Sequence, residues 1–420
     1  MVNVGHGSGR GGRRRTLSCV LLLVGAGPLV SAPVPYSSDF AAVERFADIE
    51  SQIVGSNAMF LAGEGKVRNL LARHRETIES CSTHSSFAQA VNRLIGDIGL
   101  SHFHYYTDED WQYWHLRSYS ADDSSEHQVE HAGIIPQKLG THWFVRGILE
   151  GSPADGKGLR LGDQLLSVDG APYSPVKAFR GTAGRPVKVR VRRGPDRIHE
   201  VTLVPKKESL YAAMQRAIRE SIDTVRHDEH TFAYLHGWTL LGEGREFARL
   251  LAMQDDVDGL LLDYRDGFGG TWHRAELFLL GDSDKPVSVP DHTWTKPVVI
   301  LTGEGTRSAK EIVMHAVKKA QRAPLVGEPT PGHVISVGEI AEIGDDGLLM
   351  LPGYRFDGME GNPVLPDFLI PRDIRYCGGE DVQMDFAKDL LGSLIRRENA
   401  GLTGSWDDAV RAMPSFSKAP

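Results

Sequence analysis

The feature that most constrains how this chain can fold is a short apolar run followed by a turn and a serine. Residues 298–301 (Val-Val-Ile-Leu) read as a buried strand, and residues 302–307 form a glycine-containing turn before Ser308. Residues 312–317 then read as a helix. A serine at such a strand-to-helix turn presents its hydroxyl beside the first N–H groups of the helix, as an acyl-transfer nucleophile requires. The alternative is a serine that only caps the helix.

The order of patterns predicts an α/β protein with further segments before its core. The chain has 420 residues, which favours two or three domains. Apolar residues recur at helical spacing early in the chain, for example at Phe87, Val91 and Leu94. The run at 187–192 alternates as a strand does, and strands and helices alternate from about residue 209 to 392. The expected domains are a helical N-terminal segment at 37–118, a β-rich domain at 129–207, an α/β core at 208–395 and a tail at 396–420.

The N-terminus is typical of a secretory signal peptide. Four arginines between residues 10 and 15 precede an apolar stretch from 17 to about 30, and small residues follow. This pattern predicts a signal peptide over residues 1–32 and an exported protein, periplasmic or extracellular. The alternative is an uncleaved anchor, although two glycines and Pro28 interrupt the stretch. We expect no membrane-spanning segment after the signal peptide is removed.

The net charge indicates which binding partners to exclude, and the cysteine content indicates which disulfide could form. The net charge is −8 and the sequence pI is about 6.1, so there is no broad basic field to neutralise phosphates, and we expect no nucleic-acid partner. Of three cysteines, Cys19 lies in the signal segment. Cys81 and Cys377 could pair in an oxidising compartment or remain free thiols.

A glycine-rich pattern in the β-rich domain resembles PDZ domains. Residues 151–154 (Gly-Ser-Pro-Ala) are followed by Gly-Leu at 158–159, Gly-Asp at 162–163 and Val-Asp-Gly at 168–170. The resemblance implies a domain that binds a peptide as an added strand, with loop N–H groups holding its terminal carboxylate.

The peptide-binding loop of this PDZ-like domain would contain Gly133, Ile134 and Ile135. It lacks the second glycine that many such loops carry. The alternative is a domain that only packs against the core.

Four short motifs occur in one order along the second half of the chain. Residues 257–270 run from an apolar strand into a turn ending in Gly-Gly, and 308–312 read Ser-Ala-Lys-Glu-Ile. Residues 327–332 read Gly-Glu-Pro-Thr-Pro-Gly, and 358–367 contain Glu-Gly and then Pro-Asp. In this order the motifs resemble the tail-specific, or C-terminal processing, serine proteases. The resemblance covers about residues 90 to 375. It implies a ClpP/crotonase-like core, polypeptide substrates and no cofactor.

The catalytic base departs from the best-known members of that family. They carry a lysine 25 residues after the nucleophile, where this chain has His333. The tricorn branch takes its histidine from an early Ser-His pair, which Ser101 and His102 resemble, and a late glutamate, which Glu360 matches. The resemblance therefore implies Ser308 as nucleophile and His102 as general base, oriented by Ser101 or Glu360.

The same resemblance places the oxyanion of the reaction on backbone N–H groups. These would come from Gly269, Gly270 and Ala309. Glycine permits the close approach that such a turn needs.

Three alternatives concern individual side chains. His333 could serve as the base in place of the missing lysine. His102 and His104 would share one face of a strand and could bind a metal, but no third ligand is evident, so we expect no metal site. Lys310 and Lys319 read as ordinary charges on a helix.

The leading functional hypothesis is an exported serine endopeptidase that acts on extended or unfolded polypeptides. A catalytically inactive peptide-binding protein with the same fold is the second hypothesis, and the missing lysine favours it. An esterase that uses the same serine is the third. The natural substrate, cleavage preference and oligomeric state stay open.

Overall fold

The computed structural model describes residues 40–120, 127–194, 196–242, 244–281, 293–356, 358–402 and 404–413. The expected signal peptide at 1–32 lies outside these residues. The chain divides into two compact units. Unit 1 is Met1–Thr107 with Ile335–Tyr354, and unit 2 is Asp108–Val334 with Arg355–Pro420. Among the described helices, none combines the length and apolar character needed to cross a bilayer.

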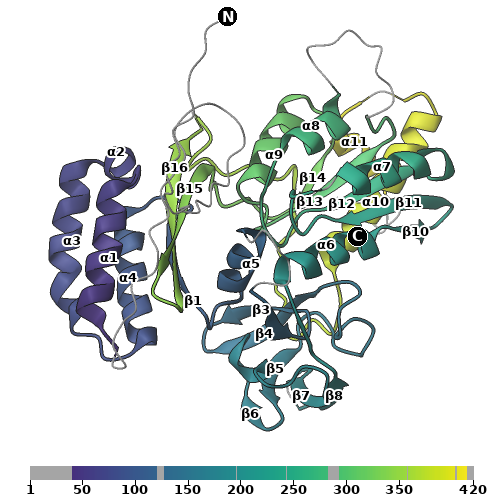
Figure 1. Cartoon of the computed structure of the whole chain (residues 1–420). Helices are drawn as coiled ribbons and strands as arrows, with labels where there is room; N and C mark the ends of the chain where they lie inside the picture. Colours follow the sequence, from purple (N-terminus) through teal and green to yellow (C-terminus); the bar gives the residue numbers. More distant parts are fainter. Residues whose placement is uncertain are drawn as a thin grey trace, which may run out of the picture. The chain divides into compact units, whose positions relative to one another are not determined.

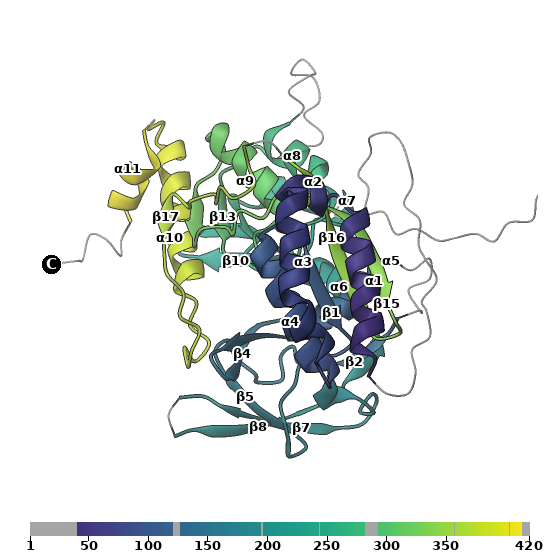
Figure 2. The ribbon, with the colours of Figure 1, turned by 90° about the vertical axis from the view of Figure 1, so that its left-hand side faces the viewer.

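Unit 1 is a helical layer packed on a small antiparallel sheet. Apolar residues at helical spacing, such as Phe46, Ile49 and Ile53, are fully buried, which confirms the predicted helical pattern. Figure 2 shows the long helices running side by side. The helices are α1 (Ala42–Gly55), α2 (Ala58–Ala62), α3 (Glu64–Glu79) and α4 (His84–Ile98), and the sheet has the order β1 (His104–Thr107), β16 (Gly347–Arg355), β15 (Ile335–Ile343).

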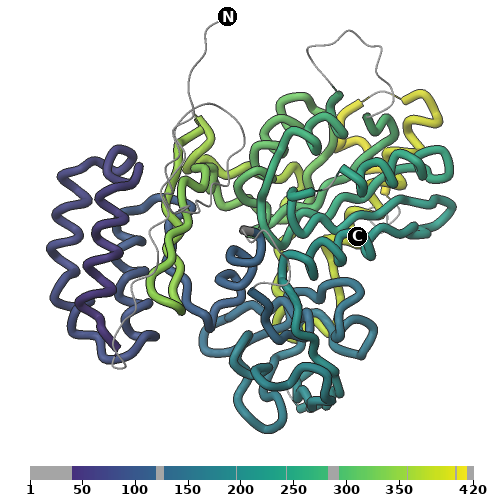
Figure 3. Tube along the Cα trace, in the orientation of Figure 1, coloured from purple at the N-terminus to yellow at the C-terminus, as the bar shows by residue number. Residues whose placement is uncertain are grey.

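The hairpin β15–β16 comes from the part of the sequence expected to be core, yet it packs with the N-terminal helices. Its Ile343 and Leu349 share one buried cluster with Phe87 of α4. The Arg45 guanidinium of α1 donates to Asp346 at the hairpin tip over 2.7 Å. Figure 3 lets the reader follow the light-green hairpin to the purple helices. The expected boundaries follow the chain, whereas these contacts join residues about 300 positions apart.

Unit 2 contains a six-stranded sheet covered by helices on both faces (Figure 1). Five strands are parallel and β10 is an antiparallel edge. This confirms a mixed α/β chain and the predicted strand at 298–301. The sheet order is β10 (Asp223–His227), β11 (His230–His236), β12 (Gly259–Asp263), β13 (Val298–Thr302), β14 (Leu325–Gly327) and β17 (Phe368–Leu369).

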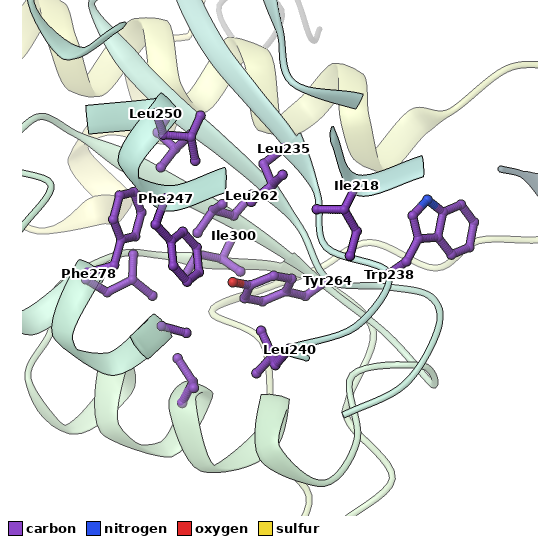
Figure 4. Close-up of a cluster of buried hydrophobic side chains, with 14 of the residues drawn as sticks. Ile218, Leu235, Trp238, Leu240, Phe247, Leu250, Leu262, Tyr264, Phe278 and Ile300 are labelled. Carbon is purple, nitrogen blue, oxygen red and sulfur yellow. The ribbon is translucent and has the colours of Figure 1, made fainter. Parts of the chain in front are cut away.

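Alternating side chains of the central strands bury both faces of this sheet. Leu260 and Leu262 of β12 join the cluster under one helical layer, and Leu261 joins the cluster under the other. Figure 4 shows the first cluster, with Tyr264 and Phe278 among its side chains. One layer holds α6 (Leu210–Ser221), α7 (Gly244–Met253), a 3-10 turn (Gln254–Asp256), α8 (His273–Leu280) and α9 (Ala309–Lys319), and the other holds α10 (Val382–Asn399) and α11 (Trp406–Arg411).

The β-rich region of unit 2 is a separate sheet preceded by α5 (Trp111–Ser120). Its first and last strands, β2 (Val129–His131) and β9 (Lys206–Glu208), pair with each other. The two ends of the region therefore lie side by side. The predicted strand at 187–192 is β7, which is a confirmed expectation. The sheet is formed by β3 (Ile134–Leu139), β4 (His142–Ile148), β5 (Gln164–Val168), β6 (Ala171–Pro172), β7 (Val187–Arg192) and β8 (Ile198–Leu203), with a 3-10 turn at Lys177–Phe179.

The two described cysteines are free thiols. The Cys81 thiol donates to the Thr77 carbonyl over 3.3 Å, and the Cys377 thiol donates to the Leu161 carbonyl over 3.2 Å. Of the two alternatives left by the sequence, the structure has the unpaired one.

Candidate active site

Ser308 stands at the junction of β13 and α9, where the sequence predicts it. Helix α9 begins at the next residue, Ala309. The Ser308 backbone has φ 61° and ψ −127°, a region that costs a residue other than glycine of the order of 1–3 kcal/mol. Its N–H donates to the His333 carbonyl over 3.0 Å. Such a strained turn at the end of a parallel strand is typical of an exposed catalytic nucleophile.

The glycine turn after β12 lies directly against Ser308. A Cβ atom added to Gly269 would be 2.6 Å from the Ser308 Cβ and 3.0 Å from the Ala309 nitrogen. The Gly269 carbonyl accepts the Leu240 N–H over 2.9 Å and the Thr239 hydroxyl over 2.8 Å. Only glycine fits this contact, which brings two of the three predicted oxyanion residues together.

Gly270, the third predicted oxyanion residue, packs on a different neighbour. Its φ of 141° lies in the region that favours glycine, and an added Cβ would be 2.7 Å from the Leu240 carbonyl carbon. Leu240 therefore holds both glycines in place.

A second loop, residues 330–334, contacts the Ser308 backbone. The backbone of His333 accepts from Ser308, while its side chain is exposed. The Val334 N–H donates to the Glu360 carboxylate over 2.6 Å, and the Gly361 N–H donates to the Gly332 carbonyl over 2.9 Å. The structure therefore links the Glu360 turn to the loop that contacts Ser308.

Ser101 and His102 belong to unit 1, where they follow α4. The Ser101 Oγ lies 3.4 Å from the His102 Nδ1, and it accepts the Ile335 N–H over 3.3 Å. His102 has a positive φ of 52°. The sequence-predicted residues thus occur as two groups, one in each unit: the Ser-His pair, and the group around Ser308.

The expected peptide-binding loop lines a pocket within unit 2. Gly133, Ile134 and Ile135 form part of its wall, with Trp111 of α5 among the other lining residues. The Gly133 N–H already donates to the Nδ1 of His131 over 3.0 Å. One backbone donor of the loop is thereby used inside the fold.

Lys310 is not the ordinary helix charge that the sequence suggests. Its side chain is completely buried, and its ammonium donates to the Asp266 carbonyl over 2.5 Å. That expectation is wrong because Lys310 shares the inward face of α9 with Val313 and Val317. The i, i+3, i+7 spacing was visible in the sequence. Lys319, by contrast, is exposed.

Glu311, which the sequence analysis did not single out, is also completely buried. Its carboxylate accepts the Gly332 N–H and the His333 N–H, each over 2.7 Å. The capping-box position three residues after Ser308 was a signal that could have identified it.

Buried ion pairs fix the start of the glycine turn. The Arg265 guanidinium donates to Asp263 and, over 2.7 Å, to Asp381. Burial alone would raise the pKa of Asp263, but the Arg265 charge overrides it and holds that pKa well below its usual range. Asp266 pairs with Arg146 of β4. Burial likewise acts to raise the Asp266 pKa, and the Arg146 charge outweighs it and lowers the pKa.

An aromatic stack holds the middle of the same turn. The His115 ring of α5 lies parallel to the Phe268 ring, with centroids 4.0 Å apart, and the Arg307 guanidinium lies 5.2 Å from the centre of Phe268. Burial, with the Arg307 charge adding to it, lowers the pKa of His115 to about 3. The imidazole is therefore neutral at ordinary pH.

Comparison with known proteins is consistent with this site. Residues 231–369, which include both glycines, Ser308 and Glu360, match peptidase family S41. Tricorn protease homolog 1 of Streptomyces coelicolor is 25% identical over 362 residues, which cover 76% of this chain and 32% of that protein.

Two further relatives are processing proteases. Carboxy-terminal processing protease CtpB of Bacillus subtilis is 24% identical over 50% of this chain and 48% of its own length. The carboxyl-terminal-processing protease of a Synechocystis species is 24% identical over 58% of this chain and 63% of its own length. The chain thus spans less than two thirds of each of these relatives. The chain is thus similar to peptidase family S41 over residues 231–369, and the proteins it resembles include carboxyl-terminal processing proteases and a tricorn homologue.

Proposed function

We propose that this protein is a serine endopeptidase in which Ser308 is the nucleophile and His102 is the general base. The observation that carries the proposal is the strained Ser308 turn, with Gly269 packed against its Cβ and the first N–H of α9 beside it. A serine held in this way, next to donors that can receive a developing negative charge, has the parts needed for acyl transfer.

The reaction would proceed through an acyl-enzyme. His102 takes the Ser308 proton as the hydroxyl oxygen attacks the peptide carbonyl, and the oxyanion is held by N–H groups of Ala309 and of the turn at Gly269 and Gly270. The imidazolium gives its proton to the leaving amine, which departs. Water then attacks the ester, again with His102 as base, and releases the acid and Ser308.

Two groups would orient the His102 ring. Ser101 lies 3.4 Å from its Nδ1 within unit 1, and Glu360 belongs to the turn linked to the 330–334 loop. Because His102 and Ser308 belong to different units, the proposal requires unit 1 to deliver the imidazole to the serine.

The relatives' names and the β-rich region support a proposal for the substrate class. Extended or unfolded polypeptides, taken near a C-terminus, are the proposed substrates of a ClpP/crotonase-like core. Residues 129–207 would act as a PDZ-like domain that binds the polypeptide through Gly133, Ile134 and Ile135. The signal-like N-terminus supports export to the periplasm or cell exterior.

His333 is a second candidate for the base. The hydrogen bond between its carbonyl and the Ser308 N–H, 3.0 Å long, keeps its backbone beside the nucleophile. Its side chain is exposed, whereas the His102 ring has the Ser101 Oγ 3.4 Å from its Nδ1.

Labelling with a fluorophosphonate probe tests the proposal. We expect the wild-type protein to be labelled at Ser308, with labelling lost in Ser308→Ala and in His102→Ala. The exposed His142→Ala is the control and should label normally. If His333→Ala loses labelling and His102→Ala keeps it, the base is His333. Folded wild-type protein that resists the probe and leaves unfolded protein uncleaved would instead be a binding protein. Labelling with cleavage of small esters alone would indicate an esterase.

A further inference from the structure

We infer that Lys310 and Glu311 are positioning residues that hold the two segments in contact with Ser308, the glycine turn at 266–270 and the loop at 330–333. They are neighbours in the first turn of α9, both completely buried. Neither would touch the substrate. The inference rests on the proposed function, because it assigns them a role in keeping the reacting geometry of that site.

Glu311 organises the loop at 330–333. One carboxylate oxygen accepts the Gly332 N–H over 2.7 Å and the Thr330 hydroxyl over 2.5 Å. The other accepts the His333 N–H over 2.7 Å and the Ser308 N–H over 3.3 Å. One side chain therefore ties the loop and the nucleophile's own backbone to the same helix turn.

Lys310 does the same for the glycine turn. Its ammonium donates to the Asp266 carbonyl over 2.5 Å and lies 5.4 Å from the centre of the Tyr264 ring. Asp266 begins the five-residue turn that ends with Gly269 and Gly270. The lysine thus adds a backbone anchor at the start of the turn, where the Asp266 carboxylate already pairs with Arg146.

The energetics favour a geometric role over a stabilising one for Lys310. Removing an ammonium from water is costly, and a packed apolar side chain of similar volume often serves stability as well or better. A cation near a helix N-terminus is also disfavoured by the helix dipole. A methionine would avoid both costs, and what it lacks is the bond to Asp266.

The negative charge of Glu311 is favourable near the N-terminus of α9. Its complete burial nevertheless points to a positioning role, as it does for Lys310. A buried carboxylate is tolerated when hydrogen bonds satisfy it, and four donors converge on this one. A glutamine could keep the donors on one oxygen. Its amide group would then face the His333 N–H, donor against donor.

The expected consequence is a loss of rate rather than of binding. A displacement of about 1 Å at a reacting centre lowers rate by about a hundredfold. Both loops would shift by moves of this kind if their anchors were removed. The substrate-binding surfaces elsewhere would remain.

The test compares Lys310→Met with Lys310→Gln, and Glu311→Gln with wild type. For a fluorophosphonate, we expect the maximal inactivation rate to fall on the order of a hundredfold in Lys310→Met and Glu311→Gln. The half-saturating probe concentration should change less than threefold. Lys310→Gln, whose amide can donate to the Asp266 carbonyl, should recover part of the rate. The exposed Lys319→Met is the matched control on the same helix and should behave as wild type.

Three results separate the possibilities. Wild-type inactivation rates in folded Lys310→Met and Glu311→Gln would overturn the inference and leave the proposed function intact. Wild-type protein that is never labelled at Ser308 would overturn the proposed function itself. If Lys310→Met does not fold, the folded Lys310→Gln decides, because retention of much of the wild-type rate in it and in Lys310→Arg, which also donates, supports the role of the hydrogen bond. A hundredfold loss in both despite their donors would contradict it.

Discussion

The turn that packs against Ser308 and the turn that carries Glu360 are built in opposite ways. The turn at 266–270 is packed against its neighbours, since an added Cβ on Gly269 would be 2.6 Å from the Ser308 side chain. The turn at 358–361 is open, because its Gly358 and Gly361 have no heavy atom within 4 Å of an added Cβ. It is linked to the loop at 330–334 by hydrogen bonds, including those from Val334 to Glu360 and from Gly361 to Gly332.

This difference fits the two tasks that the proposed chemistry sets. Donors for an oxyanion work best when they are fixed in advance. An orienting carboxylate needs only to be within hydrogen-bond reach of the ring it serves. The packed turn should therefore tolerate much less change than the open one, and the following variants test that contrast.

The largest effect is expected for Gly269→Ala. The new methyl group would overlap Ser308 and the backbone nitrogen of Ala309 at 3.0 Å, so the nucleophile or the turn must move. We expect fluorophosphonate labelling to slow by at least about a hundredfold. Gly303→Ala is the control, because its added Cβ meets nothing closer than 3.7 Å. Equal labelling of the two variants would mean that the close contact has no catalytic role.

His115 tests whether the packed turn also depends on its aromatic support. Its pKa is about 3 in the fold because it is buried, against about 6.5 when unfolded. As pH falls below 6.5 the unfolded chain gains a proton that the folded chain does not, so stability declines toward pH 3. At pH 5 the loss is about 2 kcal/mol relative to neutral pH.

The matched variant for this pH effect is His115→Phe, which keeps a ring against Phe268 and has no proton to gain. The free energy of unfolding is measured in urea with a signal from unit 2 at pH 7 and at pH 5. It should decline less between the two pH values in the variant than in wild type. Parallel declines in the two proteins would show that His115 does not supply the pH dependence.

The sequence predicts the packed turn better than its supports. The apolar strand at 298–301 and the serine after it are local patterns, and both are found where expected. The burial of Lys310 follows from helix periodicity, but lysine is usually an exposed residue, so its type predicted a surface position. The place of Ile335–Tyr354 in unit 1 depends on contacts with residues about 300 positions earlier, which no local pattern encodes.

An effect of intermediate size is expected for Glu360→Ala, in the open turn at 358–361. The variant removes the acceptor for the Val334 N–H and one of the two groups proposed to orient His102. We expect labelling to slow by roughly tenfold, because Ser101 remains; loss of a sole orienting acid costs on the order of 10⁴. In the double variant with Ser101→Ala, the loss should exceed the product of the two single losses. A loss in Glu360→Ala alone as large as that in His102→Ala would make Glu360 the sole orienting group.

The smallest effect is expected for Gly358→Asn in the open turn. Gly358 has φ +75°, a left-handed conformation that asparagine adopts more readily than other side chains. Its added side chain has open space, so labelling should stay within about twofold of wild type, in contrast to Gly269→Ala. Gly358→Val separates strain from contact, since a β-branched residue resists this backbone conformation. If asparagine proved as damaging as alanine at 269, space around the Glu360 turn would matter to catalysis, and the contrast between the two turns would not hold.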